Sequence, residues 1–213
     1  MSRHHSRRTS GIVLFLLPMV LGACFGSSQP SRFYTLSSLR GPEPVSSATS
    51  TGQAAVVAFG PLAIPDYLDR PEIVTRTGQN EVRVNEFQRW AGALDGNLSR
   101  TIVEDLSVLL PSERYSVMRR AAAAQTMVPV KYRVMVDVRR FDAAPGGTVV
   151  LEADWSVSGT DKEMPLMRKS IISSKVGGSE FPDLVAAMSK AVEDLCREIA
   201  AGVTDLDKGP AKN

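Results

Sequence analysis

The N-terminal segment limits what this chain can fold into, because it ends in a cysteine that marks where the mature protein would begin. A basic start with three arginines precedes an apolar stretch over residues 12–21. This layout is typical of a secretory signal. The apolar stretch has about ten residues, whereas a membrane-spanning helix needs roughly 20. We therefore expect residues 1–23 to be a signal peptide that is removed.

The four residues Leu21-Gly22-Ala23-Cys24 match the lipobox of bacterial lipoproteins, in which the cysteine thiol receives a diacylglyceryl group and the new amine is acylated. Each buried methylene contributes ~0.8 kcal/mol, so two or more chains anchor a protein stably. We predict lipidation of Cys24. Phe25 follows in place of aspartate, which by analogy with other Gram-negative lipoproteins favours the outer membrane, facing the periplasm. An ordinary secretory signal that ends near a cysteine is the alternative.

Charge and residue usage argue against several functions. Without its signal the chain has 22 basic and 23 acidic residues, because three of the 25 basic residues leave. No cationic excess remains to hold nucleic acid. Both histidines, His4 and His5, also leave, which removes histidine-based nucleophile systems and the commonest zinc ligand. Cys196 is then the remaining free thiol, predicted to be a small core residue. We therefore expect that the protein is not an enzyme and binds neither a cofactor nor a metal.

The rest of the chain predicts one α+β domain over residues 32–203, between a lipidated tether over 24–31 and a flexible tail over 204–213. Apolar residues at spacings of three and four predict two amphipathic helices, over 91–110 and from Phe181 to Ile199. Alternating or continuous apolar runs predict strands at 32–36, 54–59, 73–77, 81–87, 114–118, 132–138, 149–157 and 166–176. We expect a largely antiparallel sheet with both helices packed on one face. The conformation of 121–126 stays open.

A loop with two prolines is the strongest candidate for a contact surface. It runs from Ile64 to Arg76, and its prolines restrict the backbone. Aromatic and apolar side chains between charged neighbours can present a docking surface. The predicted partner-binding residues are Pro65, Asp66, Tyr67, Leu68, Arg70 and Trp90. Two alternatives stay open: the loop's apolar residues can fold back onto the core, and Trp90 can close the end of a helix–sheet core.

Carboxylates offer little support for catalysis. Glu104 and Asp105 fall on the polar side of the first predicted helix, where we expect them to be solvated. Asp137 and Asp154 can face each other across a hairpin, but a single cross-strand pair is weak evidence for acid–base chemistry.

Four features together carry a resemblance to a known family: the lipobox, Phe33-Tyr34-Thr35-Leu36, the segment Ile64-Pro65-Asp66-Tyr67-Leu68 and the helix entry at Trp90. The chain resembles the ABC-type transport auxiliary lipoproteins, which include paraquat-inducible protein C. The similarity covers residues 21–203.

The resemblance implies a part in lipid traffic across the Gram-negative envelope. There, proteins with mammalian-cell-entry (MCE) domains form hydrophobic conduits, served by a permease and an ATPase. The implied role is an outer-membrane piece, single or a homo-oligomer, that docks the MCE protein. Direct binding and relay of phospholipid is a second mechanism. A structural envelope lipoprotein is the third interpretation.

Overall fold

The computed structural model of the protein describes residues 29–39, 54–144, 146–161 and 164–208. The chain divides into two units, residues 1–30 and 31–213, and the account below concerns the second. The predicted signal peptide and Cys24 lie outside the described residues. So does most of the predicted connection over 37–53.

The described part contains eight strands, three α-helices and one 3₁₀ helix. In chain order they are β1 (Arg32–Tyr34), β2 (Ala55–Ala63), η1 (Asp66–Leu68), β3 (Glu72–Arg76), β4 (Val82–Trp90), α1 (Leu94–Leu109), β5 (Tyr115–Arg119), α2 (Arg120–Thr126), β6 (Val130–Ala143), β7 (Thr148–Gly159), β8 (Leu166–Lys175) and α3 (Phe181–Lys208). None of the described helices is long and apolar enough to cross a membrane.

The strands form two sheets, one of five strands in the order β5-β2-β6-β7-β8 and one of three in the order β1-β4-β3. The longest ladders, β6–β7 and β7–β8, are antiparallel. The predicted α+β class is confirmed. One sheet was expected, however, and the chain forms two because the segment after β2 leads the β3–β4 hairpin away to pair with β1.

Parallel pairing around β2 is a further difference from the expectation. β2 runs parallel to both of its neighbours, β5 and β6. Parallel neighbours need a long crossover connection, commonly a helix. Here the chain between β2 and β5 includes α1, and the chain between β5 and β6 includes α2.

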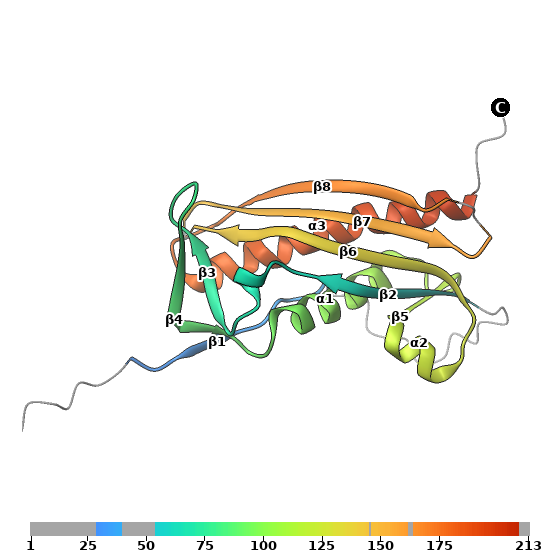
Figure 1. Cartoon of the computed structure of the whole chain (residues 1–213), viewed down its shortest axis with the longest axis horizontal. Coiled ribbons are helices and arrows are strands. Elements are labelled where there is room, and N and C mark those ends of the chain that lie inside the picture. Colours follow the sequence, from blue (N-terminus) through green and yellow to red (C-terminus); the bar gives the residue numbers. More distant parts are fainter. Residues whose placement is uncertain (1–28, 40–53, 145, 162–163, 209–213) are drawn as a thin grey trace, which may run out of the picture. The chain divides into compact units, whose positions relative to one another are not determined.

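One hydrophobic core lies between the five-stranded sheet and the two long helices. α1 packs against β2, β5 and α3, while α3 lies along β6, β7 and β8 (Figure 1). We call the face of the five-stranded sheet that α1 and α3 cover the inner face, and the opposite face the outer face. The alternation predicted for β6 and β7 is confirmed, because their inward residues are buried: Tyr132, Val134, Val136, Val138, Val149, Leu151, Ala153, Trp155 and Val157.

Two segments are more helical than expected. Residues 120–126, rich in alanine, form α2, whose Ala123 is buried against the rest of the fold. The predicted start of the tail at residue 204 is wrong, because α3 continues to Lys208. The Asp207 carboxylate holds this last turn by accepting hydrogen bonds from Tyr115 Oη at 2.8 Å and Lys131 Nζ at 2.9 Å. Residues 209–213 lie outside the described part.

The prediction for Asp105 is also wrong. Its side chain has no exposed surface, and Oδ1 accepts a 2.7 Å hydrogen bond from the Leu39 backbone N–H. Burial raises the pKa of Asp105 to about 6, against the opposing effect of the Leu39 N–H, and nearby Glu193 adds to the rise. Glu104 is partly exposed, as expected of a solvated residue, and pairs with Arg100.

Candidate docking surface

The loop singled out from the sequence is a folded element. After β2 the chain makes the short 3₁₀ helix η1, in which the Leu68 N–H donates to the Pro65 carbonyl at 2.9 Å. The Leu68 side chain is 3% exposed and belongs to the core. Downstream, the Trp90 N–H donates to the Pro71 carbonyl at 2.7 Å. The loop is thus tied to the body at both ends.

A buried carboxylate on β6 fastens this loop to the outer face of the sheet. Asp142 has no exposed surface. It accepts hydrogen bonds from Tyr67 Oη at 3.1 Å, Arg76 Nη2 at 2.8 Å and Arg140 Nε at 2.9 Å. The three donors come from η1, β3 and β6. One carboxylate therefore joins the loop and the smaller sheet to the larger sheet.

The electrostatics of this cluster favour the charged carboxylate. Burial by itself would raise the pKa of Asp142, but the hydrogen bonds from Arg76 and Arg140 outweigh it and hold the pKa below its usual value. Burial, together with the negative charge of Asp142, raises the pKa of the Tyr67 hydroxyl. Tyr67 therefore stays a neutral donor to an ionised acceptor.

Sequence reasoning missed Asp142 for a local reason. The register of β6 against β7 shifts between Val138 and Arg140. Phe141 then faces the core, and Asp142 points to the outer face. The alternation that predicts the strand over 132–138 ends where this shift begins, and the partner Arg76 lies 66 residues away in sequence.

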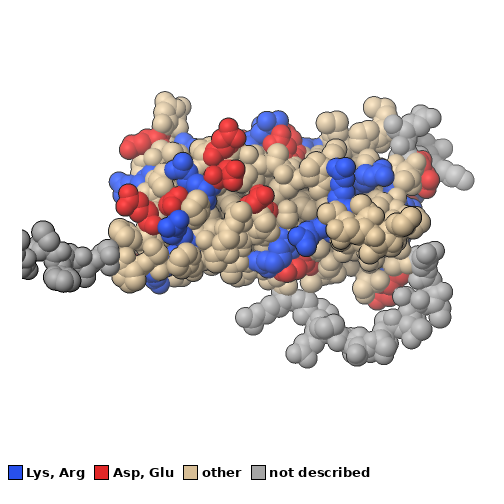
Figure 2. Space-filling view, turned by 60° about the horizontal axis from the view of Figure 1, so that its bottom comes forward, with Lys and Arg blue, Asp and Glu red and all other residues tan. Residues whose placement is uncertain are grey.

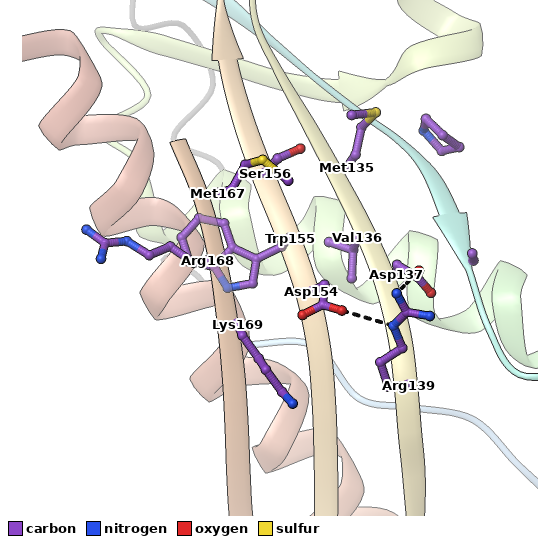
Figure 3. Close-up of a pocket in the computed structure, with 12 residues that line it drawn as sticks. Met135, Val136, Asp137, Arg139, Asp154, Trp155, Ser156, Met167, Arg168 and Lys169 are labelled. Atoms are coloured by element: carbon purple, nitrogen blue, oxygen red, sulfur yellow. Dashed lines mark hydrogen bonds and ion pairs between the residues drawn. The ribbon is translucent and has the colours of Figure 1, made fainter. Parts of the chain in front are cut away.

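Next to the loop, the outer face carries an open groove of about 590 Å³, which we call the outer groove (Figure 3). Pro61 and Ala63 at the end of β2 border it, and Met135 and Met167 supply exposed apolar surface. Ala63 leads directly into the loop, and Arg139 on the groove is next in sequence to Arg140, which donates to Asp142, so the fastened loop adjoins the outer groove.

Five charged residues line the groove, and three of them form ion pairs with one another, whereas Arg168 and Lys169 add positive charge. Asp137 and Asp154 do face each other across the β6–β7 ladder. The Arg139 guanidinium lies between them, 3.1 Å from Asp137 and 2.9 Å from Asp154 (Figure 3). This arrangement neutralises part of the acidic charge. Among the residues that the structure describes, no group of three or more histidine, cysteine, aspartate or glutamate side chains is placed to hold a metal ion.

The six predicted partner-binding residues do not share one environment. Leu68 and Trp90 are each 3% exposed and lie in the core, where a partner cannot reach their side chains. For both residues this favours the alternative given from the sequence: Leu68 folds back onto the core, and Trp90 closes one end of it. Asp66 and Arg70 are exposed, whereas Pro65 and Tyr67 are partly buried. The four accessible residues remain candidates for contact.

On the face that Figure 2 shows, basic and acidic side chains are interspersed. No continuous field of one sign covers this face, in keeping with the nearly equal counts of acidic and basic residues in the chain. Such a surface gives no electrostatic preference for a polyanion.

The comparisons with known proteins identify the family. The ABC-type transport auxiliary lipoprotein component family matches residues 34–200, and the chain belongs to this family. The fold is similar to a crystal structure of an uncharacterized protein, at TM-score 0.65 and 19% identity over 82% of this chain and 99% of that chain. It is also similar to a Xanthomonas campestris protein of the DUF330 family, at TM-score 0.63 and 17% identity over 85% and 100%. No curated protein matches the chain.

Proposed function

We propose that this protein is a non-catalytic lipoprotein of the outer membrane that docks an MCE-domain conduit, using the outer groove and the adjoining loop. Family membership supports a role as the auxiliary lipoprotein of an ABC-type transport system. The MCE partner, with its permease and ATPase, comes from the resemblance noted in the sequence. The predicted acylation of Cys24 supplies the membrane attachment.

The observation that carries the docking proposal is the fastening of the loop at Asp142 beside the outer groove. A surface that is already ordered loses little conformational entropy when a partner binds. Three donors hold Asp142 at 2.8 to 3.1 Å. Exposed methionine side chains in the groove are adaptable contacts for an apolar partner surface.

The first experiment is a mild-detergent pull-down of the full-length protein from its own envelope, with proteins and lipids identified by mass spectrometry. We expect an MCE-domain protein without stoichiometric lipid. Stoichiometric phospholipid on the isolated protein, with no MCE partner, would instead favour the lipid-relay mechanism. Recovery of neither would favour a structural envelope lipoprotein.

A matched pair of variants locates the contact. Met167→Glu places a charge in the outer groove, whereas Met127→Glu places one on another highly exposed methionine, at the end of α2. Both side chains are exposed, so both variants should fold. We expect about a tenfold or greater loss of MCE capture for Met167→Glu, on the order of 1.4 kcal/mol or more. Equal capture by the two variants would contradict a role for the groove.

A further inference from the structure

Two phenylalanines on the smaller sheet are exposed without a described partner in the fold. Phe33 on β1 is 64% exposed and Phe87 on β4 is 37% exposed. Phe33 pairs in register with Arg89. β4 shifts its register against β3 near this point, but Gln88 lies on the face of Tyr34, whose hydroxyl donates to it. Because side chains alternate along a strand, its neighbour Phe87 lies on the face of Phe33 and Arg89. We call these two residues the aromatic patch.

The strand that carries Phe33 is held firmly, so this side chain is not part of a frayed end. The Ala91 N–H donates to the Tyr34 carbonyl at 2.7 Å. On the opposite face of the sheet, Tyr34 Oη donates to Gln88 Oε1 at 2.6 Å, and the Tyr34 ring lies 6.3 Å from that of Phe181. With Tyr34 fixed inward, Phe33 is directed outward.

The charged residue in register with Phe33 is paired with its cross-strand neighbour. Arg89 Nη2 lies 3.2 Å from Glu72 Oε1, and these residues stand opposite each other in the β3–β4 ladder. The pair contributes no net charge beside the phenylalanines. A contact that removes water from the patch therefore does not have to bury an isolated charge.

The sequence places this patch close to the predicted lipid anchor. Nine Cα steps separate Cys24 from Phe33, which span at most ~30 Å when fully extended. If Cys24 is acylated, its acyl chains lie in the bilayer and β1 is the first strand to follow. Of the described strands, β1 is therefore the one that the covalent chain keeps nearest to the membrane.

We propose that Phe33 and Phe87 contact the same membrane leaflet that holds the acyl chains of Cys24. Aromatic side chains insert into the boundary between headgroups and acyl chains, and a lipid surface is the one apolar phase that the tether brings to this patch. This second contact would fix the orientation of the domain on the membrane. The inference rests on the acylation included in the proposed function and does not depend on an MCE partner.

The test uses the full-length acylated protein in vesicles of phosphatidylethanolamine and phosphatidylglycerol. Phe33→Cys and Phe87→Cys are each labelled with the environment-sensitive fluorophore NBD, and Ile171→Cys on β8 is the control because Ile171 is 63% exposed, as Phe33 is. Cys196 is buried and acylation would block Cys24, so each variant takes one label. Phospholipid with a nitroxide on its acyl chain reports contact with lipid.

We expect the probes at positions 33 and 87 to shift to shorter wavelength and to be quenched at least threefold more than the probe at 171. Equal weak quenching at all three positions would overturn the proposal. A wavelength shift without lipid quenching would also overturn it, because the patch would then touch protein. Mass spectrometry of the same samples separates the two proposals: a missing acyl group defeats both, whereas an acylated protein without quenching defeats only the membrane patch.

Discussion

The two faces of the five-stranded sheet each meet a buried carboxylate, and the two carboxylates behave in opposite ways. On the outer face, Asp142 is surrounded by Arg76, Arg140 and Tyr67. On the inner side, Asp105 of α1 has one backbone hydrogen bond from Leu39, and its Oδ2 has no hydrogen-bond partner among the described residues. The pKa of Asp142 is therefore lowered, whereas that of Asp105 is raised to about 6.

This contrast shows which interactions hold each layer. The helices on the inner face are held by apolar packing, which outweighs the destabilisation from burying the Asp105 carboxylate. The loop on the outer face is held by charge-assisted hydrogen bonds, which are directional and roughly twice as strong as neutral ones. Polar contacts thus set the geometry of the candidate docking surface, and apolar burial supplies the stability of the body.

The largest effect is expected for Asp142→Ala. Removing the carboxylate leaves Arg76 without its counter-charge and Arg140 with only Glu152, at 4.0 Å. Breaking a buried pair in this way costs about 3–5 kcal/mol. Both arginines keep some solvent exposure, so we expect a loss near the lower end. Urea unfolding of the purified protein measures it. A loss under ~1 kcal/mol would mean that the cluster does not stabilise the loop.

Asp105→Asn should stabilise the protein, by an amount that depends on pH. The pKa of Asp105 is raised to about 6 in the folded protein. Native Asp105 therefore does not lower the free energy of unfolding below about pH 4, and it lowers it most above about pH 6. The loss of unfolding free energy grows by ~1.4 kcal/mol for each pH unit between these limits. The variant should therefore gain on the order of 3 kcal/mol at pH 8 and little at pH 4. Unfolding curves across this range provide the measurement. A gain that does not change with pH would contradict the assignment of the charge to Asp105.

The lowered pKa of Asp142 gives the opposite pH dependence. Its contribution is complete above its unfolded pKa of about 4 and is lost as the pH falls through the lower folded value. In the Asp105→Asn background, the remaining acid sensitivity should therefore diminish when Asp142→Asn is added. Acid sensitivity that is unchanged in the double variant would place its source elsewhere.

Packing on the inner face can be tested with two helical glycines. A Cβ at Gly202 of α3 would lie 3.0 Å from the Trp155 and Leu166 side chains. Trp155 Nε1 donates to Ser170 Oγ at 2.8 Å, so the ring has little freedom to move. Gly202→Ala should cost about 1–2 kcal/mol through overpacking. Gly96→Ala in α1 meets no atom within 4 Å and should be neutral or stabilising, by up to ~1 kcal/mol.

Among the expected losses of stability, the smallest is that of Tyr67→Phe. The change removes one donor to Asp142 and keeps the ring, and a hydrogen bond to a charged group contributes about 1.5–3 kcal/mol when buried. Tyr67 is partly exposed and the two arginines remain, so we expect ~1 kcal/mol. MCE capture should be preserved if the loop geometry depends mainly on the arginines.

The sequence predicted the regular parts of the fold well. Spacings of three and four residues marked the inward side of α1 and α3, and strict alternation marked β6 and β7. These patterns are local, so a single sequence contains them. Asp105 was misplaced because a lone polar residue beside an apolar stripe does not show whether another segment, here residues 36–39, covers it.

The candidate site was only partly accessible from sequence. The loop with Pro65 and Tyr67 was found, because proline restriction is a local signal. The fastening of the loop at Asp142 was not predicted, because its hydrogen bonds join Tyr67, Arg76 and Asp142 across up to 75 residues of sequence. The outer groove was missed for the same reason: Pro61, Met135 and Met167 come together only when three separate strands are assembled.

Photo-crosslinking from the outer groove tests the central claim most directly. A photoreactive residue replaces Met167 in the groove or Val108, an exposed residue of α1, in the acylated protein in its own envelope. The account predicts an adduct with an MCE-domain protein from position 167 and none from position 108. An adduct from position 108 alone, or the absence of an MCE adduct from both positions, would contradict docking through the outer groove.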